Sequence, residues 1–492
     1  MKQPSLLDCP QEVQLKIAGF LPPADLANLC MASRSTCNVA QPLIYSTVQI
    51  SWVRKYHAPI VQSLCFLRTL LESPGLCIHV RSLQFHGDGY VDSDNPPEPG
   101  ETPEPPLVPA LPLDRLVAVI KRTSVTQKSA DIWIKKVIYS DAYAYLDVPE
   151  SHDLYTIRKV QRKWADGMMA ILLCLLPRLS RFSASTNWSQ ETRTLEAMFR
   201  LSLCPVAGDG SFPRLHSLRD VSIASTVECS PNLDPENTAE ALSTFYLPDI
   251  RTLSVSIDNP VEFTWPGPLP PNPAFLTSLD IYRLRECHLA PILSVTTALK
   301  SLRYNWFYRP DLDDQVSTET ILLDAMTNAF LKVSNTLEEL RITAWVSPAL
   351  SQGDYEDPEV TFQGSLSQLS RMSRLKILHV PWVFLIGSAT LSTDKEIGPA
   401  LPGTLQHLTL ARELLSGEEP ENRDRPMVLA LEQEIESGAL SNATSLKSIC
   451  LPQSVSGRGW SQECRDRMKA LESRSGLSLT FDTSLWTDEL AL

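Results

Sequence analysis

Apolar residues recur through most of this chain in the order apolar-x-x-apolar-x-apolar. The last two apolar positions of each triplet are two residues apart, so they share one face of a strand and predict a short strand with one buried face. The triplets are Val80-Leu83-Phe85, Leu179-Phe182-Ala184, Leu218-Val221-Ile223, Ile250-Leu253-Val255, Leu276-Leu279-Ile281, Leu299-Leu302-Tyr304, Leu337-Leu340-Ile342, Leu375-Leu378-Val380, Leu405-Leu408-Leu410 and Leu446-Ile449-Leu451.

Stretches with helical periodicity precede most of these triplets, at residues 155–176, 237–245, 318–333 and 428–435. From Leu179 onward the triplets begin 23 to 41 residues apart. Units that each add one strand and one helix predict a solenoid, in which parallel strands pair with their neighbours and helices cover one face. A doubly wound sheet is the alternative, although it requires a reversal of strand order that this steady alternation does not suggest.

Two segments depart from the alternation. The first and second triplets lie 99 residues apart, and the intervening segment 92–112 contains eight prolines, five acidic residues and no basic residue. Such a segment forms neither a helix nor a central strand, so we expect an extended, flexible loop. At the other end of the chain, Leu477, Leu479 and Phe481 alternate with period two after a predicted helix at 461–473, and we expect them to cap the array.

The first 45 residues follow a helical pattern instead. Val13, Ile17 and Leu21 share one face of a first helix, which ends at two prolines. A second helix begins near Asp25, and a third runs to Tyr45 after a serine/arginine break. Three helices this short are too small to bury their own apolar faces, so we expect a docking module for a partner surface.

Twelve residues of this segment form one recognisable pattern: Leu7, Pro10, Glu12, Val13, Ile17, Leu21, Pro22, Asp25, Leu26, Leu29, Ser33 and Arg34. This pattern resembles the F-box motif. Cys9 replaces its usual leucine and Cys37 the tryptophan of many members, and both are smaller but still apolar. The resemblance implies binding to the Skp-type adaptor of a cullin-RING ubiquitin ligase. The implied adaptor-binding residues are Leu7, Pro10, Val13, Ile17, Leu21, Pro22, Leu26 and Leu29.

The strand-helix units are similar to the irregular leucine-rich repeats found behind many F-box motifs. Most units lack the asparagine or cysteine that normally follows the strand, and Asp258 is only an approximate substitute. The expected fold is therefore α/β, with a three-helix F-box followed by an irregular, horseshoe-like leucine-rich-repeat solenoid. The expected parts are an F-box-like module at 1–48, connecting helices and a first repeat at 49–91, the acidic loop at 92–112, the solenoid at 113–482 and a tail at 483–492.

Composition narrows the possible partners. A net charge of -13 argues against general nucleic-acid binding, because phosphates would be repelled over most of the surface. The eleven cysteines form no C-x-x-C pair and no zinc-type spacing with histidine, so we expect reduced thiols and no metal site. The beginning of the chain does not resemble a secretory signal, and the most apolar run, 168–176, is too short to span a membrane. We therefore expect a cytoplasmic or nuclear location and no membrane association.

No catalytic motif is recognisable. The chain lacks the glycine-rich phosphate and dinucleotide loops, H-E-x-x-H and G-x-S-x-G, and its eight histidines lie singly. We therefore expect neither enzyme activity nor a cofactor. A hydrolase with a non-standard cysteine-histidine site is the alternative.

Strand geometry points to residues that would bind a target. Side chains between and just after the apolar positions lie on the face opposite the buried leucines, and in four central units they include arginine, tyrosine and tryptophan, which are common in binding hot spots. The predicted target-binding residues are Tyr282, Arg303, Trp306, Arg341, Trp345, His379 and Trp382. Each tryptophan could instead fold into the core. Arg303 and Arg341 would repel each other unless an acidic partner or ligand lies between them.

The two resemblances together imply the substrate-recognition subunit of a Skp-cullin-F-box ubiquitin ligase. Its partners would be the Skp-type adaptor with its cullin complex and an unknown target protein. A scaffold that carries the same two parts but acts outside a ligase is the alternative.

Overall fold

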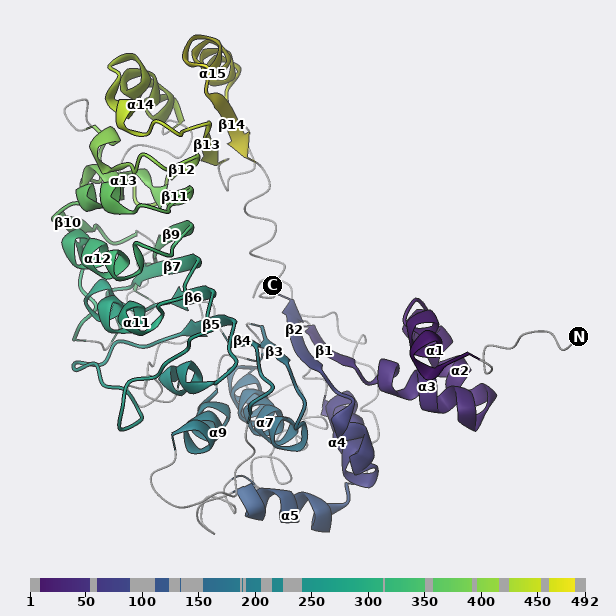
Figure 1. The fold of residues 1–492 in the computed structure, drawn as a ribbon. Coiled ribbons are helices and arrows are strands. Elements are labelled where there is room, and N and C mark those ends of the chain that lie inside the picture. The colour runs from purple at the N-terminus through teal and green to yellow at the C-terminus, as the bar shows by residue number, and fades with distance from the viewer. Residues whose placement is uncertain are drawn as a thin grey trace, which may run out of the picture. The chain divides into compact units, whose positions relative to one another are not determined.

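The computed structural model divides into two units, Met1–Ile223 and Ala224–Leu492, and each combines a parallel sheet with helices (Figure 1). The α/β class expected from the sequence is therefore confirmed. The structure describes residues 9–53, 60–88, 111–123, 133, 154–185, 188, 192–204, 215–223, 241–312, 315–349, 357–391, 396–415, 424–452 and 460–482. Most of the segment 92–112 and all of 483–492 lie outside these residues, so the expectations for them stay predictions.

Three short helices open the first unit: α1 (Gln11–Ala18), α2 (Pro23–Ala32) and α3 (Arg34–Ile44). Pro23 occupies the first position of α2, where its missing N–H costs nothing. Ser33 ends α2 and caps α3, since its hydroxyl accepts a hydrogen bond from the Thr36 N–H at 3.2 Å. Pro23 at the beginning of α2 and Ser33 between α2 and α3 thus set helix boundaries that lie close to the predicted ones.

The three helices share a small core of their own. Ala18, Leu26, Val39 and Ala40 are buried together, and Leu15, Leu29, Cys30, Leu43 and Ile44 pack against them. The expectation that these helices are too small to bury their own apolar faces was therefore wrong in part. Close packing between α2 and α3 encloses the leucine and alanine side chains, while one face of α1 stays exposed.

The rest of the first unit contributes four parallel strands in the order β1-β2-β3-β4. Its elements are β1 (Thr47–Val53), α4 (Ile60–Glu72), η2 (Pro74–Ile78), β2 (Ser82–Asp88), α5 (Leu113–Thr123), α7 (Leu154–Leu175), β3 (Arg181–Ala184), α9 (Arg193–Leu203) and β4 (Asp220–Ile223). Strand β1 was not predicted, although Tyr45, Val48 and Ile50 have the triplet spacing. Tyr45 and Val48 fall in the predicted helical module at 1–48, and Ile50 falls in the predicted connecting segment at 49–91.

The second unit contains the parallel order β5-β6-β7-β9-β11-β12-β13-β14. Its elements are η5 (Leu242–Tyr246), β5 (Thr252–Ser256), β6 (Ser278–Tyr282), η6 (Glu286–His288), α11 (Leu289–Val295), β7 (Ser301–Tyr308), β8 (Thr320–Leu322), α12 (Leu323–Phe330), η7 (Leu331–Val333), β9 (Glu339–Val346), β10 (Thr361–Gln363), η8 (Ser367–Arg371), β11 (Ile377–Pro381), α13 (Trp382–Ile386), η9 (Gly398–Ala400), β12 (His407–Ala411), α14 (Asp424–Glu436), η11 (Ala439–Asn442), β13 (Ser448–Pro452), α15 (Gln462–Ser475) and β14 (Ser478–Asp482). Strands β8 and β10 form a separate parallel pair.

Strand order follows chain order in each sheet, so neither has the reversal that a doubly wound sheet requires. The last two apolar residues of every predicted triplet lie on a strand. In the second unit they line up across neighbouring strands and are buried, as with Leu279, Leu302 and Leu340. Leu479 and Phe481 pair in register with Ile449 and Leu451, so β14 continues these apolar rows at the end of the array.

Candidate functional site

The face of the second unit's sheet opposite the buried leucines carries a row of polar side chains. The registers of successive strands align Ser254, Asp280, Arg303, Arg341, His379, Thr409, Cys450 and Thr480. Helices α11, α12 and α13 lie on one side of the strands (Figure 1). In the sequence, each of them comes after a strand that carries buried apolar residues. The polar row therefore faces away from the core.

Arg303, Arg341 and His379 occupy neighbouring positions in this row, and we call them the cationic row. Arg303 on β7 is the register partner of Arg341 on β9, which in turn is the register partner of His379 on β11. Parallel strands lie about 4.8 Å apart, so the two guanidinium groups emerge close together. Two like charges at such positions destabilise a sheet unless an anion lies between them.

The two arginines are incompletely paired. Among the described residues, none forms a hydrogen bond or ion pair with Arg303; Asp280, its register neighbour on the other side, is not ion-paired with it. Arg341 has only a long ion pair to Glu339, with 3.8 Å between Nη2 and Oε1, and its buried Nε has no partner in the described part of the chain. Both guanidinium groups therefore retain unused hydrogen-bond donors.

His379 is the third member of the cationic row and is only 8% exposed. Its Nε2 atom is buried and has no hydrogen-bond partner within the described ranges. Burial lowers the pKa of His379, and the positive charges of Arg341 and Arg303 lower it further, to about 4. The imidazole is therefore neutral at pH 7, and the charge of the row comes from its two arginines.

Trp345 lies on the same face of β9 as Arg341, four residues further along the strand, and 48% of it is exposed. At about 3.3 Å per residue, the two side chains leave the sheet about 13 Å apart. An exposed indole of this size is an apolar anchor of the kind that dominates many interfaces. Arg303, Arg341, His379 and Trp345 are thus brought to one face, as the strand geometry predicted.

Two predicted target-binding residues lie elsewhere. Trp306 and Trp382 are each 1% exposed, so neither is available to a partner at the surface, and these two assignments are corrected. Trp306 projects from the core face of β7, and Trp382 begins α13 directly after β11. Tyr282 is half-buried on the polar face, in register with Asn305. Alternation alone could not place Trp382, because it lies beyond the strand.

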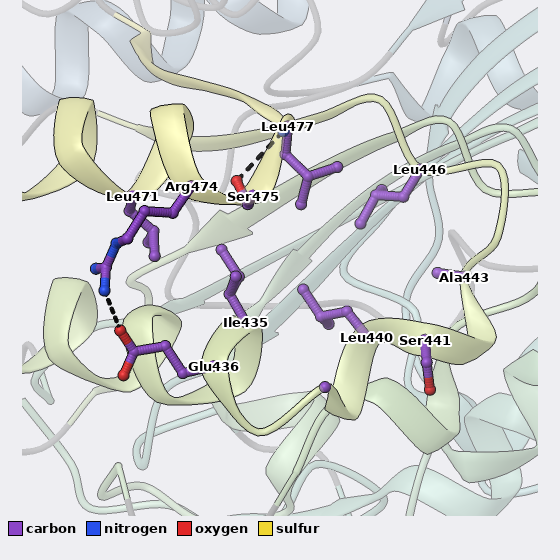
Figure 2. A pocket seen from close by; sticks show the side chains of 11 residues that line it. Ile435, Glu436, Leu440, Ser441, Ala443, Leu446, Leu471, Arg474, Ser475 and Leu477 are labelled. Carbon is purple, nitrogen blue, oxygen red and sulfur yellow. Dashed lines mark hydrogen bonds and ion pairs between the residues drawn. The ribbon is translucent and has the colours of Figure 1, made fainter.

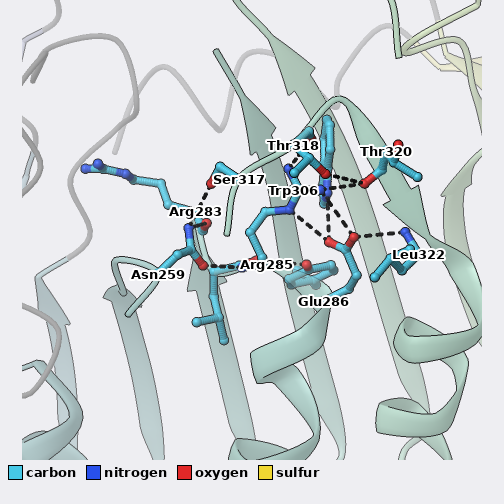
Figure 3. A network of polar contacts seen from close by, with 11 residues as sticks. Asn259, Arg283, Arg285, Glu286, Trp306, Ser317, Thr318, Thr320 and Leu322 are labelled. Atoms are coloured by element: carbon cyan, nitrogen blue, oxygen red, sulfur yellow. Dashed lines mark hydrogen bonds and ion pairs between the residues drawn. The ribbon is translucent and has the colours of Figure 1, made fainter. Parts of the chain in front are cut away.

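Trp306 belongs to a buried polar network that the sequence analysis missed (Figure 3). The Arg285 guanidinium forms an ion pair with Glu286 and donates to the carbonyls of Thr318 and Thr320, each at 2.8 Å. The Glu286 carboxylate accepts hydrogen bonds from Trp306 Nε1 at 3.1 Å and from the Leu322 N–H at 2.9 Å.

This network explains why the predicted helix 318–333 is wrong at its beginning. The backbone of residues 320–322 is extended as β8 and pairs with β10, and helix α12 begins only at Leu323. Arg285 donates a hydrogen bond to the Thr320 carbonyl, and Glu286 accepts one from the Leu322 N–H. An α-helix would use these two backbone groups in its own hydrogen bonds. The charges of Arg285 and Glu286 are paired with each other inside the network, so we interpret it as stabilising the fold and not as a binding site.

The first unit offers a different surface, made of exposed apolar side chains. Val13, Ile17 and Leu21 are 43%, 45% and 36% exposed, and Pro10 and Pro22 are also exposed. These five predicted adaptor-binding residues therefore lie at the surface, and they include one face of α1 and the turn into α2.

The other predicted adaptor-binding residues are placed differently. Leu26 is only 6% exposed and belongs to the core of the three helices, so its assignment as a contact residue is corrected. Leu29 packs partly against this core, and Leu7 lies outside the described residues. Phe20 and Met31, which were not assigned, are the most exposed of the large apolar residues there, at 82% and 78%. Phe20 lies just before Pro22 and Pro23, where the first helix ends, and this position could have indicated its exposure. The sequence pattern gave no such indication for Met31.

A hollow of about 410 Å³ lies between α14, η11 and α15 (Figure 2). Leucine side chains line much of it, and Arg474 at its edge is paired with Glu432 and Glu436. This hollow therefore offers no free charge comparable to the cationic row. Across the described part of the chain, histidine, cysteine and acidic side chains nowhere gather in groups of three or more that could hold a metal. No helix in these same ranges is both long and apolar enough to cross a membrane.

No protein-family model matches this chain, and no curated protein matches its sequence.

Proposed function

We propose that this chain is the substrate-recognition subunit of a Skp-cullin-F-box ubiquitin ligase. In this proposal the three N-terminal helices are the F-box, and the strand-helix units are irregular leucine-rich repeats that hold a target protein in the cytoplasm or nucleus. The observation that carries the proposal is the exposure of Val13, Ile17 and Leu21 on helices that already have a core of their own.

Exposed apolar residues on so small a module favour a permanent protein partner. These three side chains are already more than half buried, so complete burial of each would contribute roughly 0.5 to 1.3 kcal/mol before association costs are subtracted. Phe20 and Met31 would add to the buried area if the same partner covers them. The matching F-box residues make the Skp-type adaptor the partner to test.

The proposed mechanism is proximity. Adaptor and cullin would bring a charged conjugating enzyme to the target held by the repeats, which raises the effective concentration of a target lysine near the thioester. Chemistry would then reside in the other subunits, and this chain would supply binding and orientation.

Adaptor co-purification tests the proposal. Val13→Asp with Ile17→Asp places two charges on the exposed face of α1, and we expect it to abolish binding to the Skp-type adaptor while the circular dichroism melt stays unchanged. Gln11→Asp, at an exposed polar position of the same helix, is the matched control and should bind normally. Leu26 is unsuitable for this test because its replacement would unfold the module. Normal adaptor binding by the double variant would refute the proposal.

A scaffold acting outside a ligase shares these surfaces but differs in its effect on the target. Proteins captured by the wild-type chain should have longer half-lives in cells that lack it if it serves a ligase. Unchanged half-lives, together with preserved adaptor binding, would favour the scaffold.

A further inference from the structure

We propose that the open face of the second unit binds an acidic segment of a partner protein in an extended conformation, with one oxyanion side chain held between Arg303 and Arg341. This inference deepens the proposed function, on which it rests for identifying the partner as a ligase target. The binding itself is a property of the cationic row and can be measured without the adaptor.

Unused donors are the first argument for an anion at this position. Arg303 has no ionic or hydrogen-bond partner among the described residues, and the Nε of Arg341 is likewise without one. A carboxylate or phosphate between the two guanidinium groups would accept hydrogen bonds from both, in the bidentate geometry that arginine favours. It would also remove the repulsion between the two strands' like charges.

His379 is the second argument, because its unpartnered Nε2 lies beside the arginines in a residue that is more than nine-tenths buried. A buried polar atom without a partner is unfavourable and in native structures usually has one. His379 and Arg341 are register partners, so a ligand bound at Arg341 lies next to the imidazole. Either the oxyanion or the peptide backbone of this ligand would then provide a hydrogen-bond partner for His379 Nε2.

Trp345 gives the expected ligand a second feature. It lies four residues beyond Arg341 on the same face of β9, which is the distance that four residues of an extended peptide span. We therefore expect a bulky apolar residue four positions from the acidic one in the bound segment. The indole would anchor this residue while the arginines hold the oxyanion.

The charges around the row favour a single oxyanion over a polyanion. Asp280 flanks Arg303 and Glu339 lies beside Arg341, so the surroundings of the two arginines are not uniformly positive. With a net charge of -13, the chain would repel the repeated phosphates of a nucleic acid. A peptide with a single acidic group between the arginines would avoid repulsion from Asp280 and Glu339 and from the overall negative charge of the chain.

Fluorescence anisotropy with the full chain tests this inference. The probe is a fluorescein-labelled nonapeptide of glycine and serine with glutamate at position three and leucine at position seven, together with the reversed order. Matching peptides replace the glutamate with glutamine or phosphoserine, or the leucine with glycine. We expect the oxyanion peptides to bind about tenfold tighter than the glutamine peptide, as charge-assisted hydrogen bonds predict.

Protein variants locate the binding. Arg303→Ala and Arg341→Ala should each weaken binding of the oxyanion peptides about tenfold, and Arg341→Lys should weaken it less because it keeps the charge but loses the planar fork. Trp345→Ala should weaken only the peptides that contain leucine. Arg465→Ala, which removes an exposed arginine from α15, is the matched control and should bind normally.

The binding measurements distinguish support for the inference from its contradiction. Tighter binding of either oxyanion peptide that depends on both arginines supports the inference, and the stronger of the two identifies carboxylate or phosphate as the preferred group. Equal binding of glutamate and glutamine peptides, no measurable binding, or equal binding by the arginine variants overturns it. The Val13→Asp and Ile17→Asp double variant should bind the peptides normally, so failure here and failure of the ligase proposal are distinguishable.

Discussion

Arg303 and Arg341 occupy the same register position on the neighbouring parallel strands β7 and β9. Like charges at directly opposed sheet positions are destabilising. The pair is therefore locally unfavourable in the free chain, and its unused donors are available to an anion. Such a local conflict between stability and charge placement is typical of binding sites.

His379 should make folding stability depend on pH below neutrality. Its pKa is about 4 in the folded chain and 6.5 in the unfolded one, so the unfolded state binds more protons between these values. Stability therefore falls as the pH is lowered from 6.5 to 4, by about 3 kcal/mol from this residue alone. Urea unfolding at a series of pH values would measure the effect.

His379→Gln is the comparison that isolates this contribution. Glutamine does not titrate, so the free energy of unfolding of the variant should fall less between pH 6.5 and pH 4 than that of the wild type. If the two proteins lose stability in parallel over this range, the depressed pKa of His379 is disproved.

Arg341→Gln should raise the pKa of His379. Burial is the largest cause of the low pKa and the charge of Arg341 is the second, so the new value should lie above about 4 but remain below 6.5. Histidine proton shifts followed by NMR across pH would report it, with the signal assigned from His379→Gln. The same titration of Arg465→Gln should reproduce the wild-type value.

Trp382 and Trp345 should respond differently to truncation. Trp382→Ala removes a side chain that is 1% exposed and should lower the free energy of unfolding by about 3 to 5 kcal/mol. Trp345→Ala truncates a half-exposed indole and should cost less than about 1 kcal/mol. Urea midpoints measure both, and equal losses would contradict the assignment of Trp345 to the surface.

Much of the fold was predictable because its rule is local. Leu279, Leu302 and Leu340 were recognisable as buried from two-residue spacing, since a strand alternates its faces whatever its partner is. The same rule placed Arg303 and Arg341 on the open face.

Other features depend on contacts between distant segments, which local patterns do not encode. The extended backbone at Thr320 depends on Arg285, 35 residues earlier, and overrides the helical periodicity. Leu26 has the spacing of an exposed helix face, yet α3 covers it. Trp306, by contrast, follows from the alternation, since it lies two residues beyond Tyr304 on the core face and is buried. Trp345 lies on the opposite face of its strand and is half-exposed.

Glu286→Gln tests the most deeply buried ion pair among the described residues of the second unit. Glu286 and Arg285 are each 1% exposed, so loss of the carboxylate charge leaves the guanidinium uncompensated in the interior. We expect a loss of about 3 kcal/mol in the free energy of unfolding, measured by urea denaturation. Glu338→Gln, which breaks the exposed pair with Lys376, is the control and should leave the urea midpoint nearly unchanged.

Replacement of both charged residues distinguishes this network from a simple ion pair. Apolar replacement of a buried pair is often neutral, but Arg285 and Glu286 also bind the Thr320 carbonyl and the Leu322 N–H. Arg285→Met with Glu286→Leu would remove these hydrogen bonds from partly buried backbone groups, and each lost bond costs about 0.5 to 1.5 kcal/mol. The double variant should therefore remain as destabilised as Glu286→Gln or more so. Recovery to wild-type stability would mean that water reaches β8 and that the network does not hold its extended backbone.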